Sequence, residues 1–161
     1  MKGEFFPDID LNKLNLPPAE LKIVRRNGVF KVFDRLRKNY FCLTEEEFIR
    51  QIFVDWLIST LHYPSSLMAN EIGINLNGTK KRCDTVVFSK EAKPLVIVEY
   101  KSPKIKINQE VFDQIVRYNM VLDAKYLIVS NGITHYCCKI DNEAGTYSYL
   151  TDIPDYLSII S

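Results

Sequence analysis

The sequence contains no apolar run near the ~20 residues that a membrane-spanning helix requires. Its first ten residues, MKGEFFPDID, lack the apolar core of a secretory signal peptide. With 47% hydrophobic and 25% charged residues over 161 positions, the composition is that of an ordinary globular protein. We therefore expect a cytoplasmic protein with no membrane partner.

Cysteine and histidine are sparse, and they are not arranged as metal ligands. The four cysteines form no C-x-x-C pair, and the adjacent Cys137 and Cys138 would point to opposite faces of a strand. His62 and His135 are far apart in the chain and lack ligand-like neighbours. Reduced, structural cysteines are the favoured interpretation, and a disulfide or a zinc site is the alternative.

Nucleotide-binding fingerprints, repeats and low-complexity segments are also missing. The segment from Gly73 to Lys80 nearly matches a phosphate-binding P-loop, but it reads Thr-Lys where the motif needs Lys-Thr. It also lies in a predicted hairpin instead of a strand-to-helix turn. We therefore reject a P-loop at this position.

Turn signals organise the first part of the chain. Residues 1–19 are expected to form an extended lead-in, and residues 20–161 a single domain. The Asn-Gly dipeptide at 27–28 predicts a hairpin from Leu21 to Phe33, because a type I′ turn needs positive φ at both central residues. The basic segment 34–38 is expected to be a solvated connector, and DNA contact is the alternative.

The remaining elements follow from periodicity and capping. Thr44 and Glu47 form a capping box before an apolar helical pattern that runs to His62. A second Asn-Gly signal, at 77–78, joins a weakly alternating segment (70–76) to the strand 82–89. The further predicted elements are a strand at 95–101, a helix at 108–122, a strand at 125–130 whose connection implies parallel pairing, strands at 134–140 and 146–150, and a short helix after 152.

Three charged residues stand at the ends of two apolar strands, where burial disfavours charge. Glu99 and Lys101 project side by side from the second strand, and Asp84 lies in the strand before it. Two carboxylates can hold Mg²⁺ or Mn²⁺, which activates a bound water and neutralises charge on a phosphate. A lysine beside them can orient that water or stabilise the transition state. The alternative without a catalytic role is a surface ion pair between Glu99 and Lys101.

A basic zone surrounds these residues. The segment from Lys80 to Lys106 has a net charge of +5, so the remainder of the chain totals −4. The interpretation is a phosphate-facing surface to which Lys81, Arg82 and Lys104 contribute, and the alternative is a solvated lysine-rich turn. On the helix 108–122, Gln114 and Tyr118 stand one turn apart and can act on the same phosphate or base.

Together these motifs resemble the N-terminal nuclease domain of type I restriction enzyme R subunits, within the PD-(D/E)xK nucleases. The order is the capped helix with Glu47, then Cys83-Asp84, then Glu99-x-Lys101, then Gln114-x-x-x-Tyr118. The resemblance implies an α/β, restriction-endonuclease-like mixed sheet flanked by helices, with the N-terminal hairpin added. It implies metal binding by Asp84 and Glu99, catalysis by Lys101, and DNA positioning by Gln114 and Tyr118.

The resemblance also gives Glu47 two interpretations, a reciprocal helix cap or an additional carboxylate of the catalytic site. Glu71 is a further acidic candidate, although a surface role is favoured. The family's Pro-Asp is Cys83-Asp84 here, and the proline carries no chemistry. R subunits continue into helicase motor domains, whereas this sequence ends at Ser161, so we expect no translocation without partner subunits.

Two functions are compatible with these residues. The first is a Mg²⁺-dependent DNA endonuclease of restriction-modification type. The second is a catalytically silent nucleic-acid-binding or assembly module of a restriction complex. DNA is the expected partner in both, together with possible helicase motor, specificity or methylation subunits.

Overall fold

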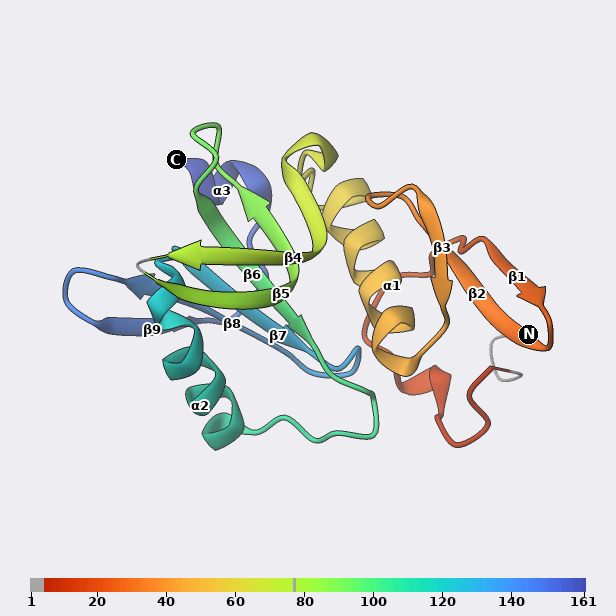
Figure 1. The fold of residues 1–161 in the computed structure, drawn as a ribbon. Helices are drawn as coiled ribbons and strands as arrows, with labels where there is room; N and C mark the ends of the chain where they lie inside the picture. Colours follow the sequence, from red (N-terminus) through yellow and green to blue (C-terminus); the bar gives the residue numbers. More distant parts are fainter. Residues whose placement is uncertain (1–4, 77) are drawn as a thin grey trace.

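The computed structural model describes residues 5–76 and 78–161 and contains two β-sheets with a helix between them (Figure 1). The small antiparallel sheet has the order β1 (Ile23–Arg26), β2 (Val29–Asp34), β3 (Asn39–Cys42). The large mixed sheet has the order β4 (Met68–Leu76), β5 (Thr79–Phe88), β6 (Pro94–Tyr100), β7 (Tyr126–Ser130), β8 (His135–Asp141), β9 (Thr146–Leu150). The predicted α/β class with a mixed sheet is confirmed.

The small sheet extends the predicted hairpin by one strand. Asn27 and Gly28 have φ of 51° and 78°, as a type I′ turn requires. The predicted connector at 34–38 is a turn in which Arg35 and Lys38 are exposed, as expected. The prediction is wrong for Asp34, which is fully buried and accepts hydrogen bonds from the backbone N–H groups of Leu36 and Arg37 at 2.7 and 3.0 Å. These bonds close a turn that sends the chain back as β3, which was not predicted.

The helix α1 (Glu45–Ser59) separates the two sheets in Figure 1. Its N-cap is Thr44, whose hydroxyl accepts from the Glu47 N–H at 3.0 Å. Phe48, Ile49, Phe53 and other apolar residues of α1 pack in one core cluster with the facing side of the large sheet. The predicted capped helix is therefore confirmed, although it ends before His62.

The opposite face of the large sheet is covered by α2 (Gln109–Asn119), from which Phe112 and Val116 enter a second core cluster. Because α2 connects β6 to β7, these two strands pair in parallel, as predicted. Cys137 belongs to the first cluster and Cys138 to the second, so they do point to opposite faces. All four cysteines are free.

The lead-in packs on the domain over its described part, residues 5–19. Phe6 is buried and meets Phe48 of α1 with ring centroids 5.3 Å apart. The Asn15 N–H donates to the Gly132 carbonyl at 2.8 Å. Short helical turns complete the fold: η2 (Leu11–Lys13), η3 (Ser65–Leu67), η4 (Met120–Leu122) and α3 (Tyr156–Ile160).

The second predicted hairpin is present as the antiparallel pair of β4 and β5, with Leu76 paired to Thr79. Asn77, the first residue of its turn signal, lies outside the described residues, and Gly78 has φ of 80°. Over the described residues, every helix is too short or too polar to cross a membrane.

Candidate active site

The three charged residues singled out in the sequence line one pocket. The register Thr85↔Val98 of β5 and β6 places Asp84 opposite Glu99. Lys101 follows directly after β6, and its Nζ lies 3.1 Å from Glu99 Oε2. The pocket, which we call the acidic pocket, has a volume of about 460 Å³ and is lined by Thr44, Glu46, Arg50, Glu71, Asp84, Glu99, Tyr100 and Lys101.

A break in the side-chain alternation brings Glu71 to the pocket. The pairs Asn70↔Thr85 and Ile72↔Cys83 place Glu71 opposite Asp84, and Glu71 has φ of 53°. On one side of this position Thr85 bonds to Tyr100 in the α1-facing layer, whereas Cys83 on the other side packs in the α2-facing cluster. The side chain of Glu71 is 27% exposed. Glu71 is therefore a partly exposed residue that lines the pocket, as the alternative of an acidic contributor predicts.

Arg50 holds these strands together from α1. Its guanidinium donates to the Asp84 carbonyl at 2.6 Å and to Glu71 Oε1 at 2.7 Å. Its Nε lies 3.0 Å from Glu47 Oε2. Burial opposes the charge of Arg50, but the Glu47 and Glu71 carboxylates raise its pKa above the ordinary value. Arg50 is thus the buried cation between the helix and the acidic strands.

The ionised form of Asp84 remains disfavoured in spite of this cation. Its Oδ2 accepts a hydrogen bond from the Tyr100 N–H at 2.8 Å. Burial raises the pKa of Asp84, and the charges of Glu99 and Glu71 raise it further, against the lowering effect of Tyr100 and Arg50. By contrast, the hydrogen bonds from Arg50 and Arg82 outweigh burial and lower the pKa of Glu71.

Glu47 does not line the acidic pocket. Its carboxylate accepts from Arg37 Nη2 at 2.6 Å and from Gln51 Nε2 at 2.9 Å. The reciprocal helix cap that the sequence offered for Glu47 is not formed by this carboxylate. The reciprocal half of the capping box is replaced by a bond from the Thr44 N–H to the Cys42 carbonyl at 3.0 Å. A catalytic role for Glu47 remains a prediction, and the α1 carboxylate at the pocket is that of Glu46.

A buried chain of hydrogen bonds links the pocket to the small sheet. The Tyr100 hydroxyl donates to Thr85 at 2.9 Å, and Thr85 donates to Asn70 at 2.6 Å. Asn70 in turn donates to Asp34 at 2.8 Å. Arg37 completes the chain, because it donates to Asp34 at 2.6 Å and also to Glu47. Strands of both sheets are therefore fixed by one polar network.

The predicted DNA-binding residues lie in different environments. Gln114 is exposed on α2, and Tyr118 is 68% exposed. Lys81 is buried over the Tyr118 ring and donates to the Tyr118 carbonyl. Arg82 pairs with Glu71 at 3.0 Å, and Lys104 pairs with Glu45 at 3.0 Å. Of these five, Gln114 and Tyr118 are exposed, and the paired side chain of Arg82 is also 70% exposed, so these three are open to a ligand.

Arg50, Glu46 and Glu71 are the pocket residues that sequence reasoning missed or undervalued. A signal for Glu71 existed, because a two-residue turn at 77–78 fixes the register of the hairpin and thereby sets Glu71 opposite Asp84. For Arg50 only its position one turn after Glu46 was available. Its partners lie on strands distant in the sequence.

The chemistry of the donors fits a hard cation. Among residues 5–76 and 78–161, no group of three or more His, Cys, Asp or Glu side chains is arranged to hold a metal ion. Mg²⁺ commonly takes one or two carboxylates and keeps several waters. Asp84 and Glu99 provide such a pair from neighbouring strands, and a cation beside Asp84 would favour the charge that burial opposes.

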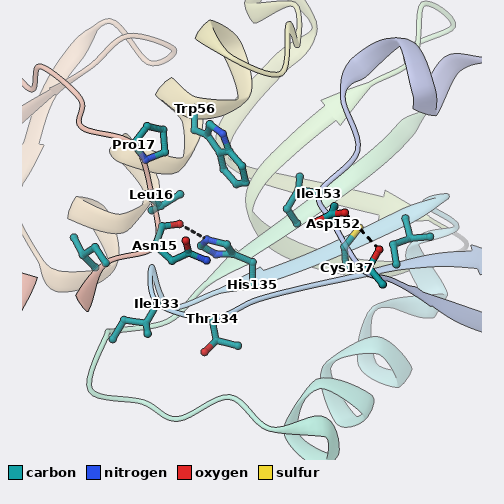
Figure 2. A pocket seen from close by; sticks show the side chains of 13 residues that line it. Asn15, Leu16, Pro17, Trp56, Ile133, Thr134, His135, Cys137, Asp152 and Ile153 are labelled. Atoms are coloured by element: carbon teal, nitrogen blue, oxygen red, sulfur yellow. Dashed lines mark hydrogen bonds between the residues drawn. The ribbon is translucent and has the colours of Figure 1, made fainter. Parts of the chain in front are cut away.

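A second pocket, of about 660 Å³, lies between the lead-in and β8 (Figure 2). His135 is its central polar side chain. The ring Nε2 donates to the Asn15 carbonyl at 2.7 Å, and Nδ1 lies 2.7 Å from the Ser130 hydroxyl. Burial lowers the pKa of His135, which favours the neutral ring. Nε2 therefore ties the lead-in to the domain and Nδ1 ties β8 to β7, in agreement with a structural histidine.

Comparison with known proteins identifies one family. The model described as the type I restriction enzyme R protein N terminus matches residues 45–154. This segment contains every residue of the acidic pocket except Thr44, and it begins after the small sheet. A comparison with curated proteins found no match.

Proposed function

Because the chain belongs to the family of the type I restriction enzyme R protein N terminus, we propose that it is a nuclease domain that hydrolyses phosphodiester bonds in DNA. The observation that carries this proposal is the convergence of Asp84, Glu99 and Lys101 on one pocket. They come from two neighbouring strands and the residue that follows, within the segment that matches the family.

Asp84 and Glu99 would hold Mg²⁺ or Mn²⁺. When bound, the ion would lower the pKa of a coordinated water and neutralise charge on the phosphate. The chain itself holds the two carboxylates in place. The Tyr100 N–H fixes one oxygen of Asp84, and Arg50 fixes the strand behind it.

Lys101 supplies a positive charge at the rim of the pocket. Its ammonium pairs with Glu99, and its side chain is 37% exposed, so it has room to meet a phosphate oxygen or to orient a water. Gln114 and Tyr118, exposed on α2, would contact the DNA strand. We assign these roles in metal binding, water orientation and DNA contact from the family resemblance and the pocket geometry together.

A second candidate is a catalytically silent binding or assembly module that acts with motor, specificity or methylation subunits. The neutralisation of Glu71 by Arg50 and Arg82 favours it, because this carboxylate is already balanced by two cations. Cleavage and metal binding separate the two candidates.

The test is a calorimetric titration of Mg²⁺ and Mn²⁺ into the wild type, Asp84→Ala, Lys101→Ala and, as a control, Glu143→Ala on the exposed β8–β9 turn. DNA cleavage is measured on the same samples. We expect Asp84→Ala to lose metal binding and cleavage. Lys101→Ala should keep metal binding and cleave about 10²–10³-fold more slowly, and the control should match the wild type.

The outcomes discriminate clearly. Metal binding by the wild type without cleavage would favour the silent module. Full cleavage by Asp84→Ala would overturn the assignment of the site.

A further inference from the structure

The small sheet has an outward face that is basic and aromatic. Val32 and Asp34 of β2 are fully buried toward the domain, so Lys31 and Phe33 point away from it. The pairing of β2 with its neighbours adds Lys22 and Arg26 from the β1 side and Tyr40 from β3. We call this surface the outer basic face, composed of Lys22, Arg26, Lys31, Phe33 and Tyr40.

Its cations lie over its aromatic rings. Lys22 Nζ is 5.5 Å from the centroid of Phe33 and 6.0 Å from that of Tyr40. The Arg26 guanidinium carbon is 4.8 Å from the centroid of Tyr40. Phe33 and Tyr40 meet edge to face at 5.3 Å. The rings thus hold the cations in place by cation–π contacts, which leave the positive charges unneutralised.

The segment that forms the outer basic face is strongly basic. Between Lys22 and Lys38, seven cations accompany one carboxylate, Asp34, which is buried on the other side against Arg37. Lys22, Arg26 and Lys31 form no ion pair with any carboxylate among the described residues.

The basic zone predicted from the sequence is different in this respect. Arg82, Lys101 and Lys104 pair with carboxylates, and Lys81 is buried against Tyr118. The basic zone keeps four cations that are in no ion pair among the described residues, but they are spread over β5, the β5–β6 turn and the segment after β6: Lys80, Lys90, Lys93 and Lys106. The unpaired cations of the outer basic face differ in that they share one sheet face with two aromatic rings.

We propose that the outer basic face binds the phosphate backbone of duplex DNA outside the acidic pocket. This inference rests on the proposed DNA function and extends the DNA contact to a surface outside the family match, which begins at residue 45. The face is joined directly to the pocket. The Leu43 N–H continues the pairing of β3 by donating to the Phe30 carbonyl at 3.0 Å, and the next residue, Thr44, lines the pocket.

The test measures binding without cleavage. A fluorescent duplex of mixed sequence is titrated with the full chain in EDTA, by anisotropy, across a series of salt concentrations. The variant is Lys22→Ala/Arg26→Ala. The control, Lys90→Ala/Lys93→Ala, removes the same charge from exposed lysines of the β5–β6 turn.

We expect the outer-face variant to weaken binding at least 10-fold at low salt, with its slope of log affinity against log salt reduced by about 2. The control should reduce the slope by less than a third of the reduction seen with the outer-face variant. Unchanged melting temperatures would show that both variants are folded.

Equal effects of the two variants, or no binding by the wild type, would overturn the proposal. Tighter binding to an RNA duplex of the same length would overturn its assignment to DNA. A protein that binds through this face but never cleaves would uphold this inference and contradict only the proposed hydrolysis. Asp84→Ala should bind the duplex at least as tightly as the wild type.

Discussion

At the scale of single residues, the acidic pocket is a balance between partly buried carboxylates and the buried Arg50. Arg50 reaches Glu71 and the Asp84 carbonyl, but among the described residues the carboxylate of Asp84 receives a hydrogen bond only from the Tyr100 N–H. Asp84 is therefore the group whose ionisation the fold opposes. An unbalanced carboxylate of this kind is typical of functional sites.

Replacing Asp84 with Asn should stabilise the protein at neutral pH. The folded-state pKa of Asp84 lies above its ordinary value of 3.8, so the folded protein holds this proton more tightly than the unfolded chain. Stability from this group is present at low pH and is lost as the pH rises through the folded-state pKa. Urea unfolding at pH 7 should show Asp84→Asn as the more stable protein, by about 1.4 kcal/mol per unit of pKa elevation.

The difference should disappear below about pH 3.8, where the carboxyl group is protonated in both states. Glu143→Gln, on an exposed turn, should leave stability unchanged at either pH. If Asp84→Asn were less stable than the wild type at pH 7, the strain assigned to Asp84 would be absent.

At the scale of elements, the sequence predicts structure well where the cause is local. The Asn27-Gly28 turn and the Thr44 cap are set by neighbouring residues, and both are present. The strand β3 was not predicted, because it is only four residues long and shows no clear alternation of apolar and polar residues. Its pairing with β2 depends on the turn that the buried Asp34 closes. The orientation of Glu47 likewise depends on Arg37, which the sequence places in an apparent connector.

Gly132, in the β7–β8 turn, packs closely against α1 and the lead-in. Its φ is +85°, and a Cβ placed there would lie 2.5 Å from Ile49 Cδ1 and 2.9 Å from Leu14 Cδ2. Gly132→Ala should therefore lower the free energy of unfolding by about 2–4 kcal/mol, combining backbone strain with overpacking. Denaturant unfolding measures this loss.

Gly145→Ala is the matched control for this substitution. Gly145 has φ of +69° with no atom within 4 Å of the added Cβ, so only the backbone strain of about 1–2 kcal/mol applies. An equal loss of unfolding free energy in both variants would show that the lead-in and α1 do not restrict the space at the turn.

At the scale of the whole molecule, the folding unit extends beyond the segment that matches the family. The match begins at residue 45, yet the core cluster beneath α1 includes Phe6 and Ile9 of the lead-in. The small sheet provides Asp34 and Arg37, which satisfy Asn70 and Glu47 inside the protein. The pocket is thus supported by residues that precede the matched segment.

A chain of residues 45–161 should consequently be much less stable than the full chain. It would expose the surfaces that Phe6 and Ile9 cover, at about 1.5–3 kcal/mol for each side chain, and it would leave Glu47 without Arg37. A chain of residues 1–154 also lacks a segment outside the match, but it loses one fully packed side chain, Ile159. Thermal unfolding should therefore show a single transition for the full chain, a slightly lower one for 1–154, and a broad or absent transition for 45–161. A sharp, unshifted transition of 45–161 would mean that the small sheet is an appendage to an independent domain, and the outer basic face could then be removed without disturbing the acidic pocket.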